Sequence, residues 1–227
     1  FSLVIIELID ITSVVELPPL LALLILIVID LPSFVTALFS MPLSMLFAAL
    51  QFSAPKFIRY IFDIYAWIFR GTPLILQLIF FYYGIPLMTN NFIAFPAFTS
   101  AAITFILNYS AYLMEIFRAG IESIEKGQYE AAYVLNLNHR QIMTRIILPQ
   151  AVRRVLPPLS NEAINLVKDT ALVIVLGIGD LMLHAREILT RDFKLLPFVI
   201  AGIIYLIFTS VLVLIFRQLE RKYVIRN

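Results

Sequence analysis

Long stretches without charge constrain this chain more than any other feature. The 33 residues from Leu20 to Phe52 contain a single charged side chain, Asp30, and a helix needs roughly 20 mostly apolar residues to cross about 30 Å of hydrocarbon. Only 14% of all residues are charged and the mean hydropathy is +0.94, whereas a soluble domain carries about 25% charged residues. The sequence therefore predicts an all-α integral membrane protein with one transmembrane domain over residues 1–227.

The same composition excludes several classes of function. The chain has no cysteine and a net charge of only +2, so disulfides, thiolate metal sites and nucleic-acid binding are not expected. It contains no G-x-x-x-x-G-K-[ST] motif, so we expect no ATP site and no cofactor on this chain. His139 and His184 are predicted on opposite sides of the membrane, so we expect no metal site.

Five segments are predicted to span the membrane. The first is interrupted by prolines and is expected to kink, and the second is broken at the sequence FRGTP. There we expect Gly71 to end one helix, Thr72 to cap the next and Pro73 to lie in its first turn. This break is interpreted as a hinge in preference to a ligand site. Residues 1–17 are short and acidic, lack the basic start of a signal peptide and are interpreted as a peripheral segment. The spans are Leu20–Phe52, Ile61–Leu87, Ala97–Phe117, Val155–Leu176 and Leu195–Phe216.

Basic residues predict the orientation of these spans. Thirteen of the 17 Lys and Arg residues are assigned to one side, twelve in the connections after spans one, three and five and Arg70 at the break in span two. The connection at 88–96 has none. Cytoplasmic connections carry the excess of basic residues. The N-terminus is therefore predicted outside and the C-terminus in the cytoplasm, with the polar segment 126–149 between spans three and four on the cytoplasmic side.

The segment 126–149 is predicted to form two short helices. The first covers 128–135, with Glu130 near its N-terminus, where the helix dipole favours a carboxylate. Asn136 stands where a helix ends in a left-handed residue. Asn138 and Gln141 have the spacing of a capping box for the second helix, which we expect Pro149 to stop. From the residues alone, an amphipathic pair on the lipid surface is as good an interpretation as a contact with another protein.

The segment resembles the EAA loop of ABC-importer permeases, which favours the protein contact. The matching residues are Glu130, Ala131, Ala132, Ile146, Leu148 and Pro149, with Asn136 at the place of the motif's glycine. Asparagine and glycine both accept the left-handed backbone conformation. The resemblance implies that these residues and Asn138 form the contact with a separate ATPase.

Further matches narrow the resemblance to polar amino-acid uptake permeases of the histidine, glutamine and arginine type. They are FRGTPLILQLIFFYYGIP (69–86), YLMEIFRAGIESIEKGQYEAA (112–132) and LPQAVRRVLPPLSNEAINLVKDTALV (148–173). In span one the family is glycine-rich, whereas this chain has Ser40 and Ser44, which still permit close helix packing. The resemblance implies a bacterial inner-membrane location, an ATP-binding-cassette ATPase dimer, a second permease copy or paralogue, and an extracytoplasmic solute-binding protein.

Two polar stripes lie within the predicted spans. Asn108, Tyr112 and Glu115 share one helix face in span three. Asn161, Asn165, Lys168 and Asp169 form a stripe in span four. Ionisable groups in a membrane face a cavity or a partner. The stripes are interpreted either as a path for a zwitterionic amino acid, with Lys168 and Asp169 the deeper candidates, or as the structural ion pairs Glu115–Arg118 and Lys168–Asp169.

The predicted function is that of the membrane-spanning permease subunit of an ATP-driven polar amino-acid importer, with ATP hydrolysis on a partner chain. The alternative is a secondary carrier or channel that acts without an ATPase. Such a carrier predicts an inverted repeat, and the sequence has no convincing one. A membrane enzyme would need a clustered nucleophile or metal-ligand set, and the sequence offers neither.

Overall fold

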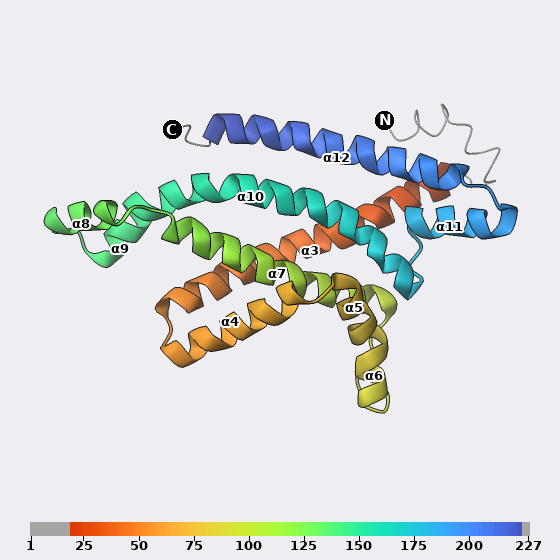
Figure 1. Cartoon of the computed structure of the whole chain (residues 1–227), viewed down its shortest axis with the longest axis horizontal. Coiled ribbons are helices and arrows are strands. Elements are labelled where there is room, and N and C mark those ends of the chain that lie inside the picture. The colour runs from red at the N-terminus through yellow and green to blue at the C-terminus, as the bar shows by residue number, and fades with distance from the viewer. Residues whose placement is uncertain (1–18, 224–227) are drawn as a thin grey trace.

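The computed structural model describes residues 19–223, all of whose regular elements are helical (Figure 1). The predicted peripheral segment, 1–17, lies outside the described residues. The long helices are α3 (Pro19–Ser53), α4 (Lys56–Gly71), α7 (Ala97–Glu122), α10 (Leu148–Asp169) and α12 (Leu196–Tyr223). The shorter ones are α5 (Leu74–Ile79), α6 (Ile85–Met88), α8 (Lys126–Val134), α9 (His139–Ile142) and α11 (Leu181–Asp192), with π-helical segments η1 (Phe80–Gly84) and η2 (Met143–Ile147) and a 3₁₀ segment η3 (Thr170–Leu176).

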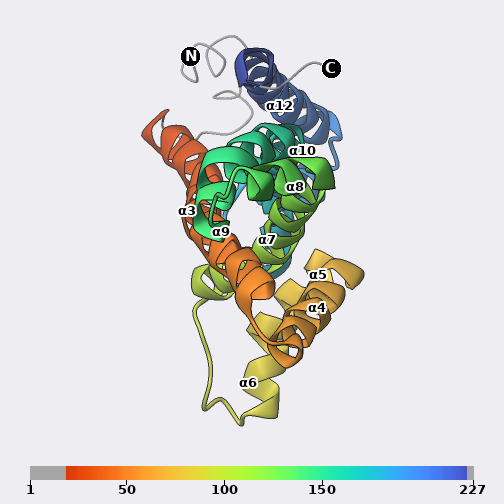
Figure 2. The same cartoon turned by 90° about the vertical axis from the view of Figure 1, so that its left-hand side faces the viewer.

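The connections gather at the two ends of the long helices. The turn between α3 and α4, the helices α8 and α9, and the C-terminal end of α12 lie at one end in Figure 1, and α11 lies at the other. Figure 2 looks onto the first end, with α8 and α9 nearest the viewer. The basic connections of the sequence therefore share one end of the molecule, as their predicted common side requires.

Within residues 19–223, three helical segments are long and apolar enough to cross a membrane, namely Ser33–Phe52, Ala97–Glu122 and Leu196–Lys222. A fourth is added if Lys56–Gly71 and Leu74–Met88, which meet at 103°, are taken as one broken span. The predicted fourth span corresponds to the second half of α10 and to η3. These residues form a helix, but polar and charged side chains of α10 line internal cavities and lower its apolar character. The total of five spans stays a prediction.

Small side chains bring α3 close to α7. Thr36, Ser40, Ser44 and Ala48 recur every four residues on one face of α3, and each is at most 3% exposed. Residues four apart lie above one another on a helix, so together they form a narrow strip. In membranes, where lipid is as apolar as leucine, close packing of such strips is a main source of helix association. The two serines therefore serve the packing that the sequence predicted for them.

A close approach also joins α7 to α10. Gly120 in α7 faces Val155 in α10, and a Cβ at Gly120 would overlap the Val155 Cγ1 atom. Gly127 in α8, by contrast, has no atom within 4 Å of the equivalent position. Glycine at 120 is therefore required by packing against a neighbouring helix.

Replacing Gly120 with alanine is expected to destabilise the protein by about 1–3 kcal/mol, the range for forcing an extra methyl group into a packed interface. Thermal unfolding of the purified protein in detergent measures the effect. The matched control Gly127→Ala should not lower the midpoint, because alanine is the better helix former. The double variant Gly120→Ala, Val155→Ala should regain much of the loss. A wild-type midpoint for Gly120→Ala would contradict this account of the interface.

Candidate functional site

Side-chain amides hold the break between α4 and α5. Gln77, only 7% exposed, donates to the carbonyl oxygens of Phe69 at 2.9 Å and Thr72 at 3.2 Å. Asn108 reaches across from α7 and donates to the Phe69 carbonyl and to the Gln77 Oε1 atom, both at 3.0 Å. The last carbonyls of a helix have no partner within it. Gln77 and Asn108 supply these partners and so stabilise the bend.

The break itself confirms the prediction from FRGTP, but two of its details were wrong. Gly71 does end α4. Thr72 does not cap the next helix, because its hydroxyl donates back to the Ile68 carbonyl at 2.8 Å. Pro73 is itself the N-cap residue and has an extended backbone, so α5 begins one residue later, at Leu74.

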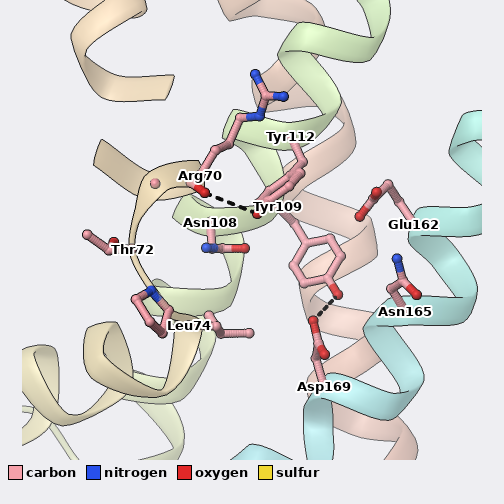
Figure 3. A pocket seen from close by; sticks show the side chains of 11 residues that line it. Arg70, Thr72, Leu74, Asn108, Tyr109, Tyr112, Glu162, Asn165 and Asp169 are labelled. Carbon is pink, nitrogen blue, oxygen red and sulfur yellow. Dashed lines mark hydrogen bonds between the residues drawn. The ribbon is translucent and has the colours of Figure 1, made fainter. Parts of the chain in front are cut away.

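A cavity of about 430 Å³ lies beside this break, between α4, α7 and α10 (Figure 3). Small-molecule sites in proteins have volumes of roughly 300–1,000 Å³, so an amino acid is a suitable size. Three charged side chains line it: Arg70 at the end of α4, and Glu162 and Asp169 on α10 across from it. The remaining lining residues are Gly71, Thr72, Pro73, Leu74, Asn108, Tyr109, Tyr112 and Asn165.

Asp169 is positioned by a tyrosine of the facing helix. The Tyr109 hydroxyl in α7 donates to the Asp169 Oδ2 atom at 2.7 Å (Figure 3). Tyr109 is 3% exposed and packs with Phe105 in the main apolar cluster. This bond ties the C-terminal end of α10 to the middle of α7. It leaves Asp169 as a carboxylate fixed on the wall of the cavity.

A second cavity, of about 410 Å³, follows the first along α7 and α10. It is lined by Glu115, Ile116 and Ala119 of α7 and by Pro158 and Asn161 of α10. Because α7 runs toward α8 and α10 runs away from α9, these residues lie nearer the α8–α9 end than those of the first cavity. Arg70, Tyr112 and Glu162 line both cavities. These three side chains therefore form the layer that separates the two spaces.

Charged groups continue from this layer along α7. The Arg70 Nη1 atom lies 3.5 Å from the Glu115 Oε2 atom. Arg118 binds Glu115 more closely, at 2.6 Å from Nη2 to Oε2, and also binds Glu122 at 2.7 Å. The predicted pair Glu115–Arg118 is confirmed. The Arg70 guanidinium also lies over the Tyr112 ring, 5.5 Å from its centre.

The predicted polar stripes divide between cavities and surface. Asn108, Tyr112 and Asp169 line the first cavity, and Tyr112 and Glu115 line the second. Lys168 is exposed and lines neither cavity. Within residues 19–223 it forms no ion pair with Asp169, whose hydrogen-bond partner is Tyr109. Of the two deeper candidates, only Asp169 faces the space between the helices.

Sequence reasoning missed Arg70, Tyr109 and Glu162 as cavity residues. A signal for Glu162 was present, because Glu162, Asn165 and Asp169 follow the three-and-four spacing of one helix face. The predicted stripe instead combined Asn161, Asn165 and Asp169 with Lys168. Nothing local marks Arg70, since its contacts with Tyr112 and Glu115 come from a helix more than 40 residues further along the chain.

The predicted helix pair of the segment 126–149 is present. Helix α8 ends before Asn136, which has a left-handed backbone with φ of 56°. Asn138 caps α9 through a complete capping box. The Gln141 backbone N–H donates to the Asn138 Oδ1 atom at 2.9 Å, and the Asn138 backbone N–H donates to the Gln141 Oε1 atom at 3.0 Å. Both features confirm predictions made from residue type and spacing.

The expected stop at Pro149 was wrong. Pro149 lies at the start of α10, and helical backbone runs on from His139 through η2 to Asp169. The π-helical turn pairs the Leu148 amide with the Met143 carbonyl, five residues back. Inside a regular α-helix, a proline lacks the N–H for the helical bond and its ring clashes with the carbonyl four residues back. The wider turn therefore carries the helix past the proline.

The two short helices share their own apolar core with the start of α10. Ala132, Ile142 and Ile147 are at most 2% exposed and pack with Ile124 and Ala151. Burial in the same cluster, together with the neighbouring Tyr133, raises the pKa of Tyr129. Because Ile142 and Ile147 are buried in this core, they are not available to contact lipid.

Exposed residues of this segment form a separate surface. Glu130, Ala131, Asn136 and Asn138 are exposed, as are Leu148 and Pro149. Ile146 is half-buried and Ala132 is buried. At the end of α8, Val134 and Leu135 are 86% and 73% exposed. The segment, which lies at the end of the molecule that faces the viewer in Figure 2, therefore exposes a carboxylate at Glu130 and the apolar side chains of Val134 and Leu135.

Comparisons with known proteins show the family of the chain. Residues 40–225 match the family described as binding-protein-dependent transport system inner membrane component. The chain is 38% identical over 189 residues to the arginine transport system permease protein of Bacillus subtilis, covering 83% of this chain and 85% of that protein. It is 41% identical over 156 residues to the glutamine transport system permease protein of Escherichia coli K12, covering 68% and 71%.

A solved structure shares the fold. The crystal structure of an amino acid ABC transporter with histidines has a TM-score of 0.80 and 32% identity to this chain, covering 87% of this chain and 91% of that one. The all-helical membrane permease fold is thus shared over most of both chains. The chain belongs to the family of binding-protein-dependent transport system inner membrane components and is an inner-membrane permease of an ABC amino-acid import system.

Proposed function

We propose that this permease carries polar amino acids through the two cavities between α4, α7 and α10. The observation that carries the proposal is the charge arrangement of the first cavity, with Arg70 on one wall and Glu162 and Asp169 on the other. A zwitterion needs groups of both signs, and charged side chains within a membrane protein face a functional space or a partner. The second cavity continues this path toward the α8–α9 end.

ATP is hydrolysed by a separate chain of the import system, and we propose that the segment 126–149 is where that chain docks. The exposed Glu130 and the apolar patch of Val134 and Leu135 supply the contact. Interfaces of this kind combine an apolar centre with charged groups that set orientation. The internal core of α8 and α9 gives this contact a fixed shape.

We further propose a complex with two permease chains, an ATPase dimer and an external solute-binding protein. One chain offers a path lined on three sides by α4, α7 and α10, and a second copy or a paralogue completes the assembly with twofold or pseudo-twofold symmetry. The family description, a binding-protein-dependent transport system, supports the solute-binding protein in this proposal.

Reconstitution of the permease with its ATPase and binding protein into liposomes tests the proposed function. Uptake of labelled arginine, glutamine or histidine should require ATP and the binding protein. Uptake at the same rate without ATP would instead favour a secondary carrier. No uptake of any polar amino acid by an otherwise intact complex would contradict the proposed substrate class.

The proposed orientation places the α8–α9 end in the cytoplasm. Two exposed positions without left-handed backbone suit labelling in this cysteine-free chain, Phe92 between α6 and α7 and Ser123 at the end of α7. In intact cells with a permeable outer envelope, Phe92→Cys should react fully with an impermeant maleimide, whereas Ser123→Cys should react only after the inner membrane is opened. The reverse pattern would invert the topology.

A further inference from the structure

Arg70 carries the only positive charge among the side chains that line the first cavity. It lies on the opposite wall from Glu162 and Asp169 (Figure 3), and it is close enough to Glu162 for the two charges to interact. An amino acid bound with its ammonium group toward the two carboxylates would direct its α-carboxylate toward the α4 side. Arg70 is the group on that side with matching charge.

The guanidinium of Arg70 is held only loosely by the protein. Its one ion pair, to Glu115, measures 3.5 Å, and within residues 19–223 its side chain donates no hydrogen bond. The side chain is 43% exposed. A guanidinium has five N–H donors, and its preferred partner is a carboxylate bound through two of them. Arg70 therefore has unused capacity for such a ligand.

Glu115 does not depend on Arg70 for its neutralisation. Arg118 donates to both carboxylate oxygens of Glu115, at 3.3 and 2.6 Å. The same Glu115 oxygen that receives the close contact from Arg118 is the one that lies near Arg70. Releasing Arg70 from Glu115 therefore leaves no unpaired carboxylate behind.

We propose that Arg70 binds the α-carboxylate of the transported amino acid, and that Glu115 competes with this carboxylate for the same guanidinium. This inference rests on the proposed path through the first cavity. When the cavity is empty, the Arg70 guanidinium lies beside Glu115, in the layer between the two cavities. When an amino acid is bound, the guanidinium pairs with its α-carboxylate instead. Glu115 thus weakens binding, and Arg70 selects molecules with a free carboxylate.

Equilibrium binding to the permease–ATPase complex in nanodiscs, without the binding protein, tests this competition. The probes are arginine, glutamine and histidine and their α-carboxamides, which lack the negative charge. Arg70→Gln should weaken binding of the acid about ten- to hundredfold, the effect of a lost charge-assisted pair, and leave the amide almost unchanged. Arg70→Lys should fall between, since it keeps the charge without the two-donor geometry.

Glu115→Gln gives the decisive result because it should tighten binding of the acid severalfold while leaving the amide unaffected. Misfolding cannot produce such a gain. Glu122→Gln is the matched control, since Glu122 pairs with Arg118 and not with Arg70, and it should match wild type. If wild-type complex binds and imports amino acids but the acid-to-amide affinity ratio is unchanged in Arg70→Gln, this inference falls alone. If wild type neither binds nor imports any of them, the proposed function falls with it.

Discussion

Exchanging Asn136 for valine is expected to reduce ATP-driven uptake at least tenfold while the permease still inserts into the membrane. Asn136 has a φ of 56° at the joint between α8 and α9. A left-handed backbone costs an ordinary L-residue roughly 1–2 kcal/mol, and a β-branched side chain is a steric outlier there. Valine would therefore shift the backbone at position 136 toward other conformations and change the angle between α8, which carries Glu130, and α9.

Two variants bracket this result. Asn136→Gly should retain near-normal uptake, because glycine adopts the left-handed conformation without strain. Glu130→Lys keeps the backbone but reverses the exposed charge, so it should impair co-purification with the ATPase or its coupling to transport. Uptake and co-purification are measured in parallel for all three. Normal coupled uptake by both Asn136→Val and Glu130→Lys would exclude this segment as the ATPase contact.

Replacing Asp169 with asparagine is the second change with a large expected effect. It removes one of the two carboxylates of the first cavity but keeps a group that accepts the Tyr109 hydrogen bond. Loss of a charge-assisted bond to the amino acid's ammonium group costs about 1.5–3 kcal/mol, so uptake at low substrate concentration should fall roughly tenfold or more. Uptake of labelled amino acid by reconstituted complex measures it.

Lys168→Gln is the matched control, since Lys168 is adjacent in sequence but exposed outside the cavity. It should leave uptake close to wild type. Tyr109→Phe separates packing from charge, because it removes the bond to Asp169 and leaves the carboxylate in place. A larger loss from Lys168→Gln than from Asp169→Asn would instead support the interpretation in which Lys168 faces the path.

The parts of the fold that the sequence predicted well depend on neighbouring residues. The turn at Asn136 and the capping box of Asn138 and Gln141 are local interactions, and both residue type and spacing carry them. The break at Gly71 is local in the same way. The Glu115–Arg118 pair spans one helical turn, so it too could be predicted from spacing.

Features that depend on distant segments could not be predicted. The partners of Arg70 and Tyr109 lie on other helices, 42 or more residues away in sequence, and no local pattern reveals them. The predicted Lys168–Asp169 pair failed because adjacent residues on a helix point in different directions. The predicted stop at Pro149 failed because a π-helical turn absorbs the proline, an adjustment that residue type alone does not indicate.

Because the helical backbone is continuous from His139 to Asp169, the segment proposed to dock the ATPase and one cavity wall would act as one lever. Its 31 residues span about 45 Å at 1.5 Å per residue. A continuous helix can transmit a displacement at one end toward the other without intermediate contacts. Movement of α9 by a docked chain would therefore shift Glu162 and Asp169 against Arg70. The π-helical turn and the prolines at 157 and 158 are the places where such a lever bends.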